Sequence, residues 1–127
     1  MPEGPEVKTT VDFLKTYTGK TISSFSVLSG RYTKKDGIKN ISNVNFPAKI
    51  ENVNCKGKFI YFTISYENNN KKCYLFNTLG MTGMWSNKIT KHARFAITFN
   101  EDLVLYYNDT RNFGTLKFVM SKLELCF

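Results

Sequence analysis

The start of the chain combines a proline with two carboxylates. Once Met1 is removed, which a small residue at position two permits, Pro2 presents a secondary amine. An α-amino group titrates near ~8, so part of it is neutral and nucleophilic at physiological pH. Attack of this amine on a sugar C1′ would give an iminium ion, with Glu3 next to it and Glu6 one helical turn on as nearby acids. The alternative is an ordinary helix start.

A lysine follows a glycine at the start of a long aromatic segment. Residues 55–59 read CKGKF, and the aromatic run KFIYFTISY begins at Lys58. A lysine at the start of a strand can direct its ammonium group towards a phosphate. The alternative is a solvated turn with no ligand.

Two short loops each carry one large apolar residue. The first, LGMTG at residues 79–83, has Met81 at its tip, where an apolar side chain can enter a base stack. The second, DTRNFG at residues 109–114, contains Phe113. The alternatives are a Met81 that folds back into the core, and an Asp-initiated turn that buries Phe113 as the start of a strand.

These residues require a scaffold, and the sequence predicts one helix followed by strands. Apolar residues at Val7, Val11 and Leu14 recur with helical spacing, which predicts a helix over residues 5–17 that ends before Gly19. About seven strand-like segments follow, and Asp36-Gly37 is typical of a hairpin turn. We therefore predict a mainly β (α+β) fold, with the helix packed on a two-layer antiparallel β-sandwich of about seven or eight strands.

Composition limits the function further. The chain has 127 residues, enough for one domain, and no apolar run of ~18 residues that would span a membrane. No secretory signal pattern is present, so we expect an intracellular protein whose compartment (nucleus, nucleoid or cytoplasm) is open. A net charge of +8 favours a polyanionic partner, most often nucleic acid.

The cysteines do not form a metal-binding pattern. Cys55, Cys73 and Cys126 have no C-x-x-C spacing, and a single histidine does not complete a zinc site. We expect reduced and mostly buried thiols and no cofactor.

Taken in order, the motifs resemble those of a known family. An MPEGPEV start, a GK-aromatic strand start, the LGMTG turn, the Lys91-His92 segment and a D-x-R-x-F-G loop occur in one chain. Together they resemble the N-terminal domain of the formamidopyrimidine-DNA glycosylase / endonuclease VIII family, along residues 2–117. The resemblance implies a bifunctional base-excision repair enzyme that removes oxidised bases from damaged double-stranded DNA and nicks the abasic site by β,δ-elimination.

The resemblance also implies a role for each of these residues. Pro2 would be the Schiff-base nucleophile, Glu3 the proton donor, and Glu6 the residue that positions the N-terminus. Lys58 would hold a phosphate beside the lesion and supply a proton in β-elimination. The DNA contacts that the motifs imply are Met81, His92, Arg111, Asn112 and Phe113.

One position departs from the family pattern. Members that act on guanine lesions commonly have an arginine directly before the wedge phenylalanine, where it pairs with the orphaned cytosine. Asn112 stands there in this chain, with Arg111 one residue earlier. An amide does not reproduce the forked guanidinium donors, so we predict a weak preference for the opposite base and a bias to oxidised pyrimidines or ring-opened lesions.

The second departure concerns how much of the family pattern the chain covers. The family pattern continues into a helix–two-turn–helix domain and a zinc or zincless finger, and we expect residues 1–127 to hold only the N-terminal domain. An enzyme would then need these parts from a longer product or from a separate partner chain. The alternatives are a truncated, catalytically weak or inactive DNA-binding module, and a basic β-sandwich that binds protein.

Overall fold

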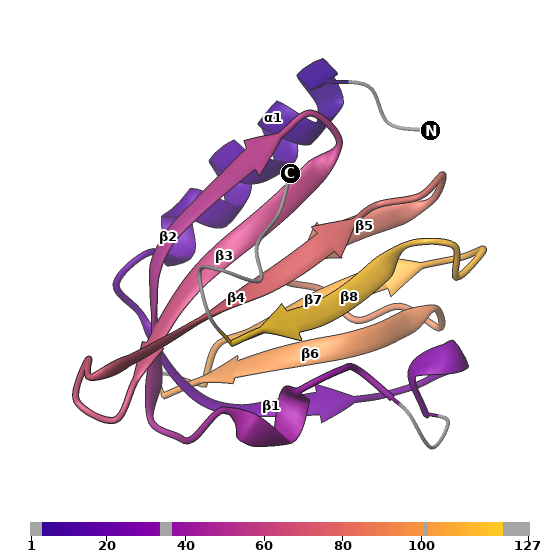
Figure 1. Cartoon of the computed structure of the whole chain (residues 1–127). Helices are drawn as coiled ribbons and strands as arrows, with labels where there is room; N and C mark the ends of the chain where they lie inside the picture. The colour runs from indigo at the N-terminus through magenta and orange to yellow at the C-terminus, as the bar shows by residue number, and fades with distance from the viewer. Residues whose placement is uncertain (1–3, 34–36, 101, 121–127) are drawn as a thin grey trace.

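The predicted N-terminal helix is present in the computed structural model, which describes residues 4–33, 37–100 and 102–120 (Figure 1). Helix α1 (Gly4–Leu14) continues into one turn of 3-10 helix, η1 (Lys15–Tyr17). Its inward side chains, Val7, Val11, Leu14 and Tyr17, are all buried, as the helical spacing of the sequence predicts. For residues 4–6 and 31 only the backbone is described.

Eight strands make up the rest of the described fold. They are β1 (Thr21–Val27), β2 (Ala48–Lys56), β3 (Phe59–Tyr66), β4 (Lys71–Thr78), β5 (Gly83–Ser86), β6 (Ala93–Phe99), β7 (Val104–Asp109) and β8 (Thr115–Val119). Within the described residues they form one antiparallel sheet in the order β5-β7-β6-β1-β2-β3-β4-β8.

The sheet folds over between β1 and β2, and this gives the two layers of a sandwich. These strands pair only through Thr21↔Lys49 and Ile22↔Ala48, whereas their other neighbours pair along most of their length. Residues from the two halves then meet face to face. The rings of Phe62 and Trp85 lie 5.2 Å apart, and those of Phe25 and Phe118 lie 5.1 Å apart. The predicted sandwich is therefore confirmed.

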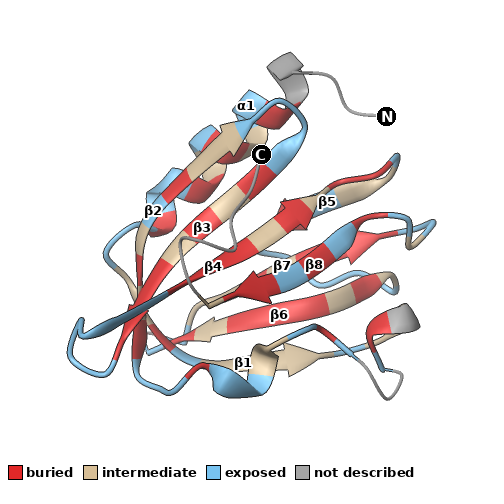
Figure 2. Ribbon diagram, viewed as in Figure 1, coloured by how far each residue is buried: buried red, intermediate tan, exposed pale blue. Residues whose placement is uncertain are grey.

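The core lies between the two layers and under α1. Buried residues run through the middle of the strands, while exposed ones gather in the turns (Figure 2). Helix α1 packs mainly against β2, with further contacts to β3 and β5. Burying this aromatic and aliphatic surface supplies the main force that holds the fold together.

The connection between β1 and β2 departs from the sequence prediction. Asp36 of the expected hairpin turn lies outside the described residues, and the described segments on either side are 3-10 turns, η2 (Gly30–Thr33) and η3 (Ile41–Asn43). A hairpin cannot form because β1 and β2 meet only where β1 begins and β2 begins. In the described part of the connection, a bridge from Lys39 to Lys117 places the chain beside β8.

The LGMTG turn joins two strands, as the sequence indicates, and the structure shows which strands they are. It joins β4 to β5, but these strands belong to different layers, since β5 pairs with β7 and β4 pairs with β3 and β8. The turn is thus a crossing between layers and not a hairpin.

Candidate functional site

The strand register gathers the predicted site residues at one edge of the sandwich. In one layer, Lys56 pairs with Phe59, Phe59 with Thr78, and Thr78 with Thr115. In the other layer, Gly83 pairs with Asp109, and Ala93 with Asn108. Four segments therefore meet there and together form what we call the loop edge: residues 56–59, 79–83, 92–93 and 109–114. In Figure 1 they lie on the same side as the start of α1.

Two apolar side chains stand out from the loop edge. Met81 is 55% exposed and Phe113 is 59% exposed. The structure therefore supports the exposed alternative for both: Met81 does not fold back, and Phe113 does not become a buried start of β8. Exposed large apolar side chains that are close together mark a surface for a partner.

Below these tips lies a buried carboxylate, Asp109, which is 0% exposed. Its Oδ1 accepts hydrogen bonds from the Thr82 hydroxyl at 2.6 Å and from the Asn112 amide at 3.1 Å. Its Oδ2 accepts from the Gly114 amide at 2.8 Å and from the Tyr107 hydroxyl at 3.3 Å. These partners satisfy both oxygens, as a buried carboxylate requires. The Asp-initiated turn considered from sequence is present, with more bonds than that motif needs.

The backbones of the two loops approach each other closely, and this explains why glycines occur at the loop edge. A Cβ atom on Gly80, whose φ is 62°, would lie 2.8 Å from the Gly114 nitrogen and 2.8 Å from the Phe113 carbonyl carbon. A Cβ atom on Gly114 would overlap the Tyr107 hydroxyl and approach the Thr78 oxygen to 2.6 Å. The two loops therefore pack backbone against backbone, which larger residues would prevent.

Tyr107 is fully buried in this network. Its single hydroxyl proton is shared between Asp109 Oδ2 and the Thr78 carbonyl, which lies 3.2 Å away. Burial raises the pKa of Tyr107 far above its usual range, and the negative charge of Asp109 raises it further. The phenol is thus a fixed hydrogen-bond donor that links β7 to the end of β4.

Arg94 fastens the second loop to the end of β1. Its Nε donates to the Asp109 carbonyl at 2.9 Å, and its Nη2 donates to the Thr110 carbonyl at 3.3 Å. Its Nη1 donates to the Ser29 hydroxyl at 3.2 Å. The sequence did not assign Arg94, Thr82 or Tyr107 to the site. The available signal was the pair Gly83 and Gly114, because both lie against the Tyr107 hydroxyl, where a side chain would not fit.

The side chains of Arg111 and Asn112 lie differently from the sequence interpretation. Asn112 is turned inward: a Cβ atom on Gly30 would be 3.0 Å from both its Oδ1 and its Nδ2. Its buried Oδ1 has no hydrogen-bond partner among the described residues. Arg111 is exposed instead, with its Nη1 4.0 Å from the Met81 sulfur. The guanidinium group therefore accompanies the apolar tips, and the amide does not.

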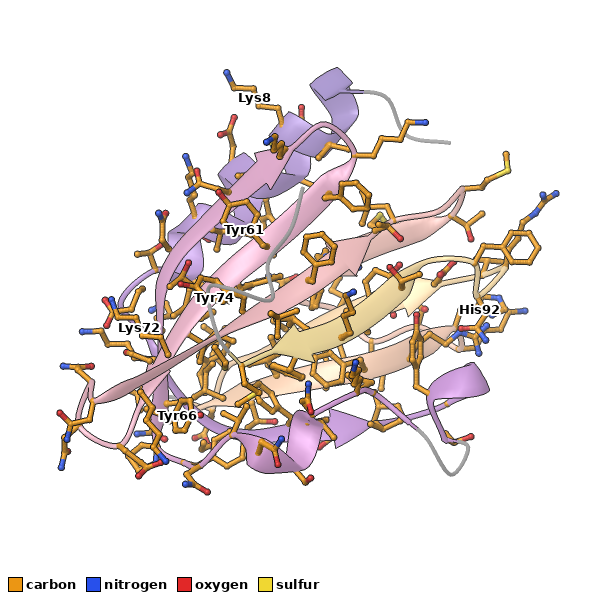
Figure 3. The ribbon with its side chains drawn as sticks, viewed as in Figure 1. Lys8, Tyr61, Tyr66, Lys72, Tyr74 and His92 are labelled. Carbon is orange, nitrogen blue, oxygen red and sulfur yellow. The ribbon has the colours of Figure 1, made fainter. Side chains whose placement is uncertain are left out.

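The other predicted contacts flank these tips. Lys58 is exposed in the turn between β2 and β3. His92 is partly buried at the same end of the molecule, opposite Tyr66 and Lys72 (Figure 3). Its carbonyl accepts from the Asp109 amide at 3.0 Å, and its amide donates to the Thr90 hydroxyl at 3.1 Å. Pro2 and Glu3 lie outside the described residues, as does the side chain of Glu6.

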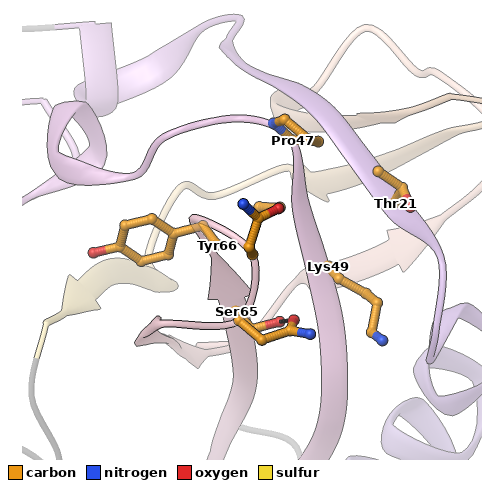
Figure 4. Close-up of a pocket in the computed structure, with 8 residues that line it drawn as sticks. Thr21, Pro47, Lys49, Ser65 and Tyr66 are labelled. Atoms are coloured by element: carbon orange, nitrogen blue, oxygen red, sulfur yellow. Dashed lines mark hydrogen bonds between the residues drawn. The ribbon is translucent and has the colours of Figure 1, made fainter.

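The opposite end of the sandwich holds a small pocket (Figure 4). Its volume is about 200 Å³, less than the ~300 Å³ of a typical ligand site. It is lined by Thr21, Pro47, Ala48, Lys49, Ser65, Tyr66, Asn68 and Asn69. None of the residues with candidate chemistry lies in it, so it does not compete with the loop edge.

No second chemical site emerges from the described part of the chain. There, no group of three or more histidine, cysteine or acidic residues could hold a metal ion, and no helix is long and apolar enough to cross a membrane. Cys73 is buried, and burial raises the pKa of its thiol to about 12, so it is not a thiolate near neutral pH.

The domain combines a helix, an antiparallel sandwich and a loop edge whose exposed apolar tips lie over a buried carboxylate. Comparison with known proteins identifies this class of domain. The model of the formamidopyrimidine-DNA glycosylase N-terminal domain matches residues 1–116. The chain therefore belongs to this family, which confirms the resemblance seen in the sequence.

Individual relatives agree with the family match. The formamidopyrimidine-DNA glycosylase of Exiguobacterium sibiricum is 32% identical over 123 residues, which cover 92% of this chain and 42% of that protein. The crystal structure of the MutM (Fpg) protein of Thermus thermophilus is 28% identical with a TM-score of 0.76, over 95% of this chain and 41% of that one. The structure of MutM in complex with DNA containing carbocyclic 8-oxo-G is 25% identical with a TM-score of 0.80, over 97% of this chain and 46% of that one. The chain thus spans less than half of each.

Proposed function

We propose that this chain is the N-terminal catalytic part of a DNA glycosylase/AP lyase that removes oxidised bases from damaged double-stranded DNA. Family membership supports a role in base-excision repair, and one matched structure is a complex with DNA that carries an 8-oxo-G analogue. The net charge of +8 suits a phosphate backbone.

One observation carries the proposal: the strand register presents basic and apolar side chains on the same edge. A base inside a duplex is inaccessible, so the damaged nucleotide must leave the stack. Apolar side chains such as Met81 and Phe113 are suited to fill the resulting gap. Lys58 and His92 flank these tips, where phosphates of a bound duplex would pass.

The proposed chemistry begins at Pro2. Its amine attacks C1′ while the bond from C1′ to the base breaks, and the base leaves with that electron pair and takes up the proton that the amine nitrogen gives up. Glu3 protonates the sugar ring oxygen, the ring opens, and the nitrogen lone pair forms the iminium ion. Loss of a proton from C2′ then expels the 3′ phosphate, and a second elimination expels the 5′ phosphate. These roles, with Glu6 positioning the N-terminus and Lys58 holding a phosphate and supplying a proton, rest on the family motif.

Borohydride trapping tests this proposal. The chain is incubated with an oligonucleotide duplex that contains an abasic site, and reduction of the iminium ion leaves a covalent adduct of the summed mass. We expect the adduct to form, and to be lost in Pro2→Gly. The matched control is Pro5→Ala, which removes a proline three positions away and leaves the N-terminal amine intact. An adduct that persists in Pro2→Gly would overturn the assignment of the nucleophile.

A second candidate is a DNA-binding module with weak or no turnover. It is favoured by the net charge of +8 and the exposed tips, which serve DNA binding whether or not Pro2 reacts. Each phosphate contact contributes ~0.9 to the slope of log affinity against log salt concentration. A shallow slope together with no adduct would support the module, and a trapped adduct would support the enzyme.

A further inference from the structure

We propose that the hydrogen bond from Thr82 to Asp109 couples the two loops, so that Met81 and Phe113 act on DNA as a single unit. Asp109 is then a positioning residue: it contacts no DNA and fixes the two side chains that do. The role in DNA binding rests on the proposed function, whereas the coupling of the loops is a property of the fold and is tested separately.

The hydrogen bond from Thr82 to Asp109 is not needed to close the turn that begins at Asp109. An Asp-initiated turn is closed by its own backbone, and here the amides of Asn112 and Gly114 already fill that role. The Thr82 hydroxyl comes from a loop 27 positions earlier in the chain, at 2.6 Å from Oδ1. This bond adds nothing to the turn and joins it to the other loop.

Thr82 is bound from both directions. While its hydroxyl donates to Asp109, the same oxygen accepts a hydrogen bond from the Arg111 amide at 2.9 Å. One side chain of the first loop thus holds the second loop at two points. Beside it, the Arg111 guanidinium lies 4.0 Å from the Met81 sulfur, so the outer parts of the loops also touch.

The anchor and the tips differ sharply in exposure. Asp109 is fully buried, while Met81 and Phe113 are each more than half exposed. The tips stand on backbone that is closely packed, since even a Cβ atom on Gly80 would press on Gly114 and Phe113. A displacement of one loop is therefore resisted by the other, and the bond from Thr82 to the fully buried Asp109 is one of the side-chain links between them.

A double-mutant cycle measures this coupling. The probe is a duplex that contains a reduced abasic site, and the variants are Met81→Ala, Phe113→Ala and the pair. Side chains that act as a unit give non-additive losses. We expect the double variant to bind at least about fivefold more tightly than the product of the single losses predicts. Repeated in a Thr82→Val background, the same cycle should be additive to within about twofold.

Two further variants separate the bond from general damage. Thr82→Ser keeps the hydroxyl and should restore the non-additivity. Thr78→Val is the matched control, because it removes a hydroxyl contact to Thr115, 2.7 Å long, between strands that are already paired. An equally large coupling in the Thr82→Val background would overturn the proposal.

A measurement without DNA distinguishes failure of the coupling from failure of the proposed function. The Gly114 amide is buried and donates to Asp109, on the far side of the bond from Thr82. We expect its hydrogen exchange to accelerate at least about fivefold in Thr82→Val and to stay unchanged in Thr78→Val. If exchange at Gly114 does not change in Thr82→Val, the loops are not coupled, whether or not the chain binds DNA.

Discussion

The two ends of the sandwich distribute polar and apolar groups in opposite ways. At the loop edge a carboxylate is buried and two large apolar side chains are exposed. At the far end, which we call the distal edge (residues 45–49 and 65–71), the turn from β3 to β4 is polar and exposed, with Glu67, Asn68 and Asn69 at φ values of 51°, 57° and 68°. Its ion pair from Lys71 to Glu67, 3.3 Å long, is open to solvent.

This difference supports the loop edge as the surface that would meet a partner. Exposing Met81 and Phe113 forgoes the stabilisation that burial would give, and burying Asp109 requires a complete set of hydrogen bonds. The turn from β3 to β4 at the distal edge has neither feature, and the exposed ring at that edge, Phe46, packs against Phe25 instead of standing free. The loop edge is therefore built to hold apolar groups in water in a fixed position, which suits insertion into a base stack.

The largest effect is expected from removing the buried anchor. Asp109→Ala leaves the buried Gly114 amide and the partly buried Thr82 hydroxyl without their acceptor, whereas the Asn112 amide keeps the backbone carbonyl of residue 109 at 3.2 Å. Because a buried unsatisfied group costs about 1–3 kcal/mol, we expect the free energy of unfolding, measured by urea denaturation, to fall by about 2–3 kcal/mol. Glu67→Ala at the distal edge removes an exposed pair and should cost at most about 0.5 kcal/mol. Equal losses would contradict the comparison.

A smaller effect, on binding and not on stability, is expected at the tips. Phe113→Ala should weaken binding to a duplex with an abasic site by about tenfold, because an inserted aromatic contributes about 1–3 kcal/mol. Its exposed ring contributes little to the core, so the melting temperature should change little. The control is Phe46→Ala at the distal edge, which removes an edge contact with Phe25, 5.0 Å between ring centroids, and should leave DNA affinity unchanged.

The preference for the base opposite the lesion tests whether Arg111 or Asn112 contacts that base. The sequence interpretation, based on Asn112, predicts little preference among the four bases. The structure places the Arg111 guanidinium beside Met81, and a well-placed arginine discriminates bases by about 1–3 kcal/mol. We expect excision assays to show a preference of about tenfold that Arg111→Ala abolishes and Asn112→Ala retains. Uniform excision opposite all four bases would support the interpretation from sequence.

The sequence predicted the elements well and the site only in part. Helical spacing located α1, and alternation with aromatic residues located the strands, because both patterns reflect local burial. The two loop motifs predicted exposed side chains at Met81 and Phe113, and both are exposed. The motifs did not show that the LGMTG turn crosses between layers, since the pairing of β5 with β7 is set by contacts distant in sequence. The bond from Thr82 to Asp109 was missed for the same reason, and so was the inward turn of Asn112.

The smallest expected effect is a loss of stability at alkaline pH. It arises in the half of the sandwich away from the loops. Burial raises the pKa of Cys73, on β4, from 9.0 to about 12. Between these values the unfolded chain releases the proton and the folded chain keeps it, so stability is complete below about pH 9 and declines as pH rises. At pH 10 the loss amounts to about 1 kcal/mol.

Thermal melts at pH 8 and pH 10 measure this loss, with Cys73→Ala as the comparison. The variant is less stable at both values because it leaves a small cavity, but it should lose less between them. Tyr107 at the loop edge also has a raised pKa, yet an unfolded tyrosine releases its proton only near pH ~10. Cys73 therefore dominates between pH 9 and 10, and identical pH dependence in the two proteins would show that burial of this thiol does not cause the loss of stability at alkaline pH.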